Sequence, residues 1–115
     1  MSRVVSHLQV PIESVEASRI RLVNGLRASG FSIDLLEEFL VEARRGSQVS
    51  FRVKGAWMAR DEEFPIVVCI RWDSASLASV AVYSEFVGPL TGVRKKYQRV
   101  CDVAAILFRH FLGTK

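Results

Sequence analysis

Apolar and polar residues alternate along four stretches of the chain, and this period of two predicts β-strands. The first stretch covers residues 3–10 and ends at Pro11, which has no N–H to give to a sheet. The other three cover residues 48–58, 66–72 and 77–86 and follow one another with short polar connections. Such connections are typical of antiparallel hairpins.

Three further segments show the spacing of amphipathic helices. In residues 13–29, Val15, Leu22 and Leu26 fall on one face, and Gly30 is placed to end the helix. Residues 33–45 begin after a capping Ser32 and end in two arginines, which predicts a second helix. Its predicted buried stripe consists of Leu36, Phe39, Leu40 and Ala43.

The third helix is predicted from about residue 90 to residue 112. The element order is therefore β-α-α-β-β-β-α, which indicates an α+β fold. We expect an antiparallel sheet of three to four strands with the helices packed on one face. A length of 115 residues fits a single domain over residues 1–115.

The second half of the last helix has a wider apolar arc than one seam requires. Beyond its main stripe it adds Val103, Ile106 and Phe108, and a helix apolar on more than one side usually contacts something besides its own sheet. In the first helix, the small residues Ala17 and Ser18 permit close approach of another backbone. We assign these five residues to an interface with another protein subunit, in a homodimer or heterodimer.

Positive charge gathers at the C-terminal end. Residues 91–115 hold 6 basic side chains and 1 acidic one, whereas residues 1–90 hold 10 basic and 11 acidic ones. Such asymmetry marks candidate surfaces for nucleic acid or acidic partners. Contact with tRNA or another RNA, an ordinary solvated helix face and an acidic protein partner all remain open for the basic cluster, which is Arg94, Lys95, Lys96 and Arg99.

Motifs for catalysis are missing from the sequence. His7 and His110 have no metal-ligand spacing, and no nucleophile elbow, phosphate loop or dinucleotide fingerprint occurs. We interpret Cys69 and Cys101 as small, buried hydrophobic residues. We therefore expect no enzyme activity, no metal and no cofactor. The sequence shows no membrane-spanning stretch and no secretory signal. We therefore expect the protein in the cytosol or nucleus and not in a membrane.

Two segments resemble the small CTAG/Pcc-type subunit of the KEOPS (EKC) complex. HLQVPIESVEASRIRLVNGL is similar to that family's first strand and helix, and LASVAVYSEFVGPLTGVRKKYQRV to its last strand and final helix. Residues 31–48 look like an insertion, and Ala78 or Ser79 stands where the family usually has an arginine.

The resemblance implies a non-catalytic subunit of the machinery that makes threonylcarbamoyladenosine in tRNA. In that family the two helices pack on the catalytic subunit, which has an ATPase fold, and the sheet pairs with a second small subunit. An alternative resemblance concerns residues 32–112, which are similar to the Alu-domain proteins of the signal recognition particle through LLEEFL and KKYQRV. It implies a standalone RNA-binding module.

Overall fold

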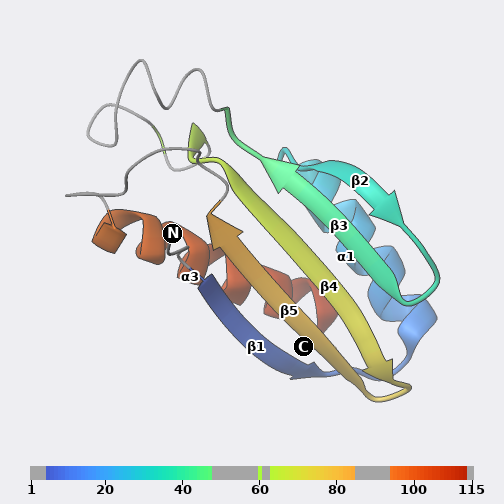
Figure 1. The fold of residues 1–115 in the computed structure, drawn as a ribbon. Coiled ribbons are helices and arrows are strands. Elements are labelled where there is room, and N and C mark those ends of the chain that lie inside the picture. The colour runs from blue at the N-terminus through green and yellow to red at the C-terminus, as the bar shows by residue number, and fades with distance from the viewer. Residues whose placement is uncertain (1–4, 48–59, 61–62, 85–93, 114–115) are drawn as a thin grey trace.

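An antiparallel sheet forms the centre of the computed structural model, which describes residues 5–47, 60, 63–84 and 94–113 (Figure 1). Its strands stand in the order β1-β5-β4-β3-β2. The elements in chain order are β1 (Val5–Pro11), α1 (Val15–Ala28), β2 (Ser32–Leu36), β3 (Leu40–Arg45), β4 (Ile66–Ser74), β5 (Leu77–Ser84) and α3 (Arg94–Leu112).

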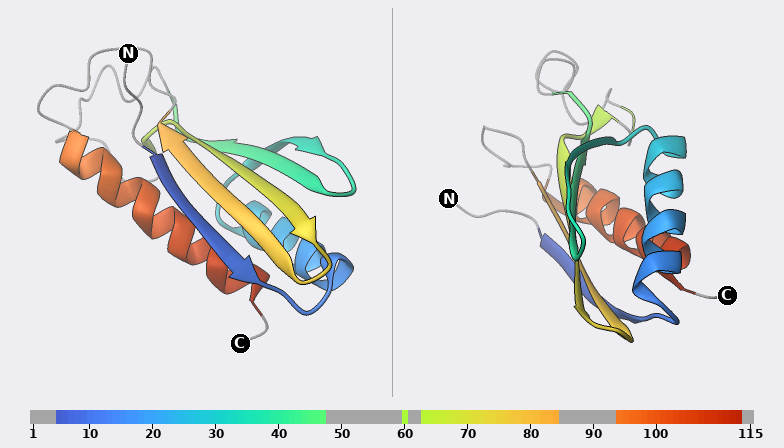
Figure 2. Two further views of the ribbon diagram at one scale, coloured as in Figure 1. Left: turned by 60° about the horizontal axis from the view of Figure 1, so that its bottom comes forward. Right: turned by 90° about the vertical axis from the view of Figure 1, so that its right-hand side faces the viewer.

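The predicted α+β class is confirmed, but the sheet has five strands within the described residues rather than three to four. Both described helices lie on the same face of the sheet, as Figure 2 shows from two sides. The first strand of the chain pairs with β5 and forms one edge of the sheet, and β2 forms the other edge.

Alternation along the strands separates a covered face from an open face. In β4, Ile66, Val68 and Ile70 are fully buried beneath the helices. Arg71, which points the other way, is exposed, and Cys69 is half-buried. The hydrophobic core therefore lies between the sheet and the two helices, as the period of two predicts.

Local signals in the sequence define the two ends of α1. The hydroxyl of Ser14 accepts a hydrogen bond of 3.0 Å from the N–H of Ala17, which caps the helix. Gly30 follows the last turn with a φ of 84°, a conformation that costs glycine little. Leu22 and Leu26 are fully buried, so the predicted helix over residues 13–29 is confirmed in its main extent.

The prediction of a helix over residues 33–45 is wrong, because this segment forms the hairpin of β2 and β3. Leucine, glutamate, alanine and arginine favour helices, but tertiary packing overrides that preference. Val41 lies opposite Ile70 and Ala43 opposite Val68, so β3 fills the covered face of the sheet and pairs with β4. Ser32, predicted as a helix cap, is instead the first residue of β2.

The packing of this hairpin also differs from the predicted stripe. Phe31 is buried, and its ring meets Phe108 edge to face at 5.2 Å between centroids. Leu36 and Phe39 are exposed by 51% and 52%, where a buried stripe was expected. The strand predicted at 48–58 lies outside the described residues, as do residues 90–93 of the last predicted helix.

Candidate protein-binding surface on α3

The solvent-facing side of α3 carries two large apolar side chains. Val103 is exposed by 59% and Ile106 by 52%. The opposite side of the same helix is buried against the sheet and α1, through Tyr97, Ala104 and Phe108. We call the exposed residues Val103 and Ile106, with the basic residues Lys95 and Arg99 one to three turns earlier on the same side, the α3 face.

Phe108 does not belong to this face. Its side chain is fully buried and contacts Phe31 and Phe111, with ring centroids 5.2 Å and 6.3 Å away. Its assignment to a partner interface is therefore corrected, since the chain covers this side chain itself. The predicted arc was too wide by one residue because α1 and Phe31 pack against α3.

The two small residues of α1 also lie elsewhere than expected. Ser18 is fully buried, and its hydroxyl accepts a 2.9 Å hydrogen bond from the indole N–H of Trp72. It donates in turn to the carbonyl of Val15 at 3.0 Å. Ser18 thus satisfies a polar group inside the core and is corrected as an interface residue. Ala17 is half-buried on α1.

The basic cluster begins α3. Arg94, Lys95 and Arg99 are exposed, whereas Lys96 is half-buried with its ammonium nitrogen 5.6 Å from the ring centroid of Phe64. Cations at the N-terminal end of a helix oppose the helix dipole, which makes this end of the α3 face strongly electropositive. The four cations therefore lie close together at the start of α3, but their exposure and their neighbours differ.

A second apolar surface lies on α1 and β2, and the sequence pattern did not predict it. Ile20 on α1 is exposed by 55% and lies across a groove of about 370 Å³ from Leu36. Arg19 lines this groove and donates a hydrogen bond to the carbonyl of Glu38 at 3.2 Å. A neighbouring hollow of about 420 Å³ is lined by Phe39 and Trp72. The incorrect prediction of a helix over residues 33–45 placed Leu36 and Phe39 in the core, and for this reason the surface was not predicted.

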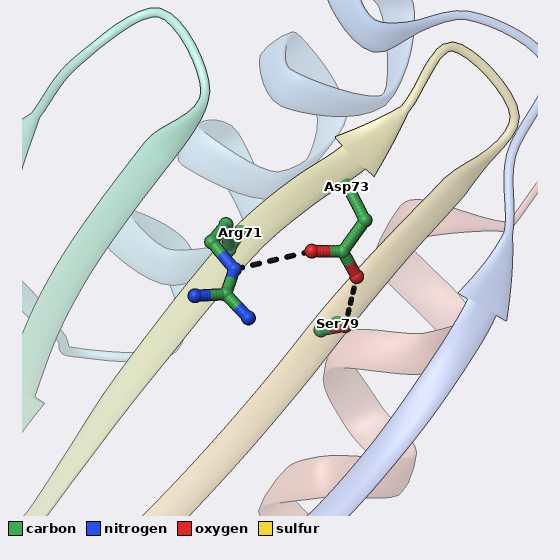
Figure 3. Close-up of polar contacts among 3 residues, drawn as sticks. All are labelled: Arg71, Asp73 and Ser79. Carbon is green, nitrogen blue, oxygen red and sulfur yellow. Dashed lines mark hydrogen bonds and ion pairs between the residues drawn. The ribbon is translucent and has the colours of Figure 1, made fainter.

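Polar side chains gather on the open face at the β4–β5 hairpin (Figure 3). Arg71 donates from Nε to Asp73 at 3.1 Å, and the hydroxyl of Ser79 donates to the other carboxylate oxygen. The hydrogen bond from Ser79 is the main reason why the pKa of Asp73 lies below its usual value. A carboxylate of lowered pKa is a weak base and is therefore poorly suited to activate Ser79. The hydrogen bond between Asp73 and Ser79 instead links β4 to β5 and braces the hairpin.

The two cysteines are reduced and differ in exposure. Cys101 is fully buried, and burial, followed by the charge of Asp102, raises the pKa of its thiol to about 12. Burial and Glu42 raise the pKa of the half-buried Cys69 thiol as well. Thiolates are scarce at neutral pH in both places, which disfavours a nucleophilic role.

This raised pKa predicts a loss of stability in alkali. The neutral thiol of Cys101 is favoured in the folded state, whereas in the unfolded chain it ionises near its ordinary value of 9.0. Stability from this group is therefore full below pH 9 and falls between pH 9 and about 12, by up to about 1.4 kcal/mol per pH unit. Urea unfolding at pH 8 and pH 10 should show a drop about 1 kcal/mol larger in the wild type than in Cys101→Ala. Equal drops would contradict the expectation.

Within residues 5–47, 60, 63–84 and 94–113, no three histidine, cysteine or acidic side chains gather as metal ligands would. Nor does a helix in these ranges have the length and apolar character needed to cross a membrane. His7 lies exposed on β1 and His110 exposed on α3, on different elements.

Comparisons with known proteins leave the family of this chain open. No family model matches the chain, and no curated protein or solved structure matches it either. The resemblance to the small KEOPS subunit therefore stays a prediction that rests on the two quoted segments. The α3 face contains the two apolar residues, Val103 and Ile106, that the sequence predicts to lie off the main stripe and that the structure shows exposed.

Proposed function

We propose that this chain is a non-catalytic assembly subunit that binds another protein chain through the α3 face. The observation that carries the proposal is the exposure of Val103 and Ile106, 59% and 52%, on a helix whose opposite side is already packed. Apolar side chains grouped on an exposed helix lose contact with water when a partner covers them, which favours association.

The chemistry of the remaining surface supports a binding role over catalysis. The polar cluster of Arg71, Asp73 and Ser79 braces a hairpin, and the thiols of Cys69 and Cys101 are poor nucleophiles. In contrast, the α3 face combines an apolar centre with a cationic end, a combination common at protein interfaces. A partner with an apolar patch and nearby acidic groups fits this face best.

The narrower proposal is that the assembly is a KEOPS-like complex with an ATPase-fold catalytic subunit. It rests on the two segments that resemble that family, which include β1, α1, β5 and the first half of α3. The hairpin of β2 and β3 would then be the insertion predicted at 31–48. Deleting the gene should lower threonylcarbamoyladenosine in tRNA, and an unchanged level would refute this narrower form.

The competing proposal is RNA binding by Arg94, Lys95, Lys96 and Arg99. Three of these cations are exposed at the start of α3, which favours contact with phosphates. The resemblance to the Alu-domain proteins loses one of its supports, because LLEEFL forms the end of β2, the turn and the start of β3 rather than a helix. RNA is therefore the second candidate, and nuclease treatment separates it from the first.

Replacing Ile106 by glutamate should weaken binding to the partner at least about tenfold, because a carboxylate would be buried in an apolar contact. The measurement is the sedimentation of the tagged chain in an extract of its native cells. Wild type should sediment well above the mass of the chain, and I106E should approach that mass. Ser32→Glu, an equal change of charge at an exposed position of β2, serves as the matched control and should leave the complex intact.

The outcomes of this experiment separate the two functions. If I106E and Ser32→Glu sediment alike, the α3 face is not the interface. If nuclease alone reduces the wild type to the mass of the chain, RNA and not protein holds the assembly. Circular dichroism of purified I106E should match the wild type, because an exposed side chain contributes little to folding.

A further inference from the structure

The groove between α1 and β2 is an apolar surface separate from the α3 face. It has a volume of about 370 Å³, and two of its lining side chains, Ile20 and Leu36, are exposed by 55% and 51%. Val23, which is half-buried, lines it as well. Apolar side chains that line an open groove lose contact with water when another molecule fills it. We call this surface the α1–β2 groove.

Acidic residues gather at the end of this groove where α1 begins. Glu16 precedes Ile20 by one turn on the same side of α1, and Glu37 and Glu38 belong to the turn between β2 and β3. Arg19 holds this turn against α1, because its guanidinium donates to the carbonyl of Glu38 at 3.2 Å. All three glutamates are exposed. The α1–β2 groove is therefore apolar in its middle and negatively charged at one end.

The α3 face has the same arrangement with the opposite charge. Arg99 stands one turn before the exposed Val103, and Lys95 stands one turn before Arg99. An advance of four residues is about 6 Å along a helix, so the first cation lies about this far from the apolar centre. The same spacing separates Glu16 from Ile20 on α1. The two surfaces therefore match in apolar character and in spacing, and their charges attract.

The α3 face cannot fill the groove of its own chain. Gly25 lies on the side of α1 that meets α3, because a Cβ added there would come within 2.5 Å of the ring of Phe111. Ile20 stands five residues earlier, which places it about 140° around the helix from Gly25. The α1–β2 groove thus opens on the side of α1 that is turned away from α3. An α3 face that fills it has to come from another molecule.

We propose that the α3 face of one copy of this chain binds in the α1–β2 groove of a second copy. This inference rests on the proposed function and names the partner of the α3 face. Val103 and Ile106 of one copy cover the apolar side chains of the groove, and Lys95 and Arg99 face its acidic end. The apolar contact supplies the attraction at short range, and the opposite charges orient the two copies as they meet.

This contact joins two different surfaces, so the copies associate head to tail. Within a pair, one copy keeps an open groove and the other an open α3 face, and further copies can therefore be added. The basic start of α3 and the acidic turn between β2 and β3 lie at opposite ends of the molecule (Figure 1). Head-to-tail contact brings these unlike ends together, whereas contact between two basic ends of a chain with a net charge of +4 would be repulsive.

Sedimentation of the purified full-length chain tests the proposal with one variant for each surface. The mass of the wild type should rise with concentration and pass twice the chain mass. Ile20→Glu in the groove and Ile106→Glu on the α3 face should each raise the dissociation constant at least about tenfold. Both positions are exposed on helices, where glutamate is tolerated, so the fold should remain. Ser32→Glu, exposed on β2, is the matched control and should associate like the wild type.

Mixing the two variants gives the sharpest reading. Ile20→Glu keeps an intact α3 face, and Ile106→Glu keeps an intact groove. At a concentration where each variant alone is a monomer, an equimolar mixture should form a complex of two chains and grow no further. Raising the salt should weaken this complex, because the charges at its acidic end are screened. A mixture that stays at the chain mass overturns the proposal.

The outcomes also separate this inference from the proposed function. A purified wild type that is monomeric at all concentrations, or an Ile20→Glu variant that associates like the wild type, overturns the binding of α3 in the groove. If Ile106→Glu still dissolves the complex in the cell extract, the α3 face binds a different protein, and the proposed function stands without the second copy. If Ile106→Glu behaves like Ser32→Glu both in the extract and after purification, both proposals are refuted.

Discussion

Replacing Phe108 by alanine is expected to lower the free energy of unfolding by about 3–5 kcal/mol, the largest effect of any α3 side chain considered. Phe108 is fully buried and packs on the rings of Phe31 and Phe111, so alanine would leave a cavity beside these two rings. Urea unfolding followed by circular dichroism measures the change. A loss of this size is a large fraction of the roughly 5–15 kcal/mol that stabilises an ordinary domain.

Ile106→Ala on the same helix is the matched control. Its side chain is 52% exposed, so truncation should change the stability of the monomer by no more than about 0.5 kcal/mol. The comparison has to be made below any dimer dissociation constant. Similar losses for the two variants would mean that Ile106 is covered within the single chain, and the α3 face would lose its role as an interface.

Gly46→Ala is expected to cost about 2–5 kcal/mol, since it combines a backbone penalty with a steric one. Gly46 follows β3 with a φ of 100°, which L side chains rarely adopt. A Cβ there would lie 2.3 Å from the carbonyl oxygen of Phe64 and 2.7 Å from the nitrogen of Pro65. Because both contacts are backbone atoms, a rotamer change cannot relieve them, and the buried Phe64 would have to move.

Gly30→Ala separates the two parts of this penalty. Its φ of 84° is also positive, but an added Cβ would meet only the side chain of Arg45, at 4.0 Å. The backbone penalty alone should therefore remain, about 1 kcal/mol. Thermal and urea unfolding of both variants measure the difference, and equal losses would show that the contact with Phe64 contributes nothing.

Elements whose apolar pattern matches their burial were predictable from the sequence. β4 is a short and almost continuous apolar run from Ile66 to Trp72 and lies in the middle of the sheet, so its apolar pattern and its burial agree. α1 has both a cap and a stop, at Ser14 and Gly30, which fix its ends locally. In these elements the local signal and the tertiary environment favour the same structure.

The segment from Ser32 to Arg45 was not predictable in this way. Its composition favours a helix, and the two features that decide otherwise are distant in sequence: pairing of β3 with β4 and burial of Val41 against the sheet. Pairing between segments more than 20 residues apart produces no hydrophobic pattern within the segment itself. The helix preference of its leucine, glutamate, alanine and arginine residues therefore dominated the prediction. Leu36 and Phe39 were placed in the core for this reason.

The candidate site was predictable in part. Val103 and Ile106 were found because their positions lie off the main stripe of the helix, which a helical wheel reveals. Phe108 lies closer to that stripe, and only the packing of Phe31 shows that it is enclosed. Which N–H and C=O groups of β1 point away from β5 could not be predicted from the sequence, because their direction depends on the register with β5.

Photo-crosslinking in the native cells tests most directly whether the exposed side of α3 contacts another protein chain. Benzoylphenylalanine at position 106 should give an adduct of one discrete mass, and the same group at the exposed position 27 of α1 should give none. An adduct of twice the chain mass would identify the partner as another copy of this chain. Identical results at the two positions, or no adduct at 106, would contradict the assignment of this surface to protein binding.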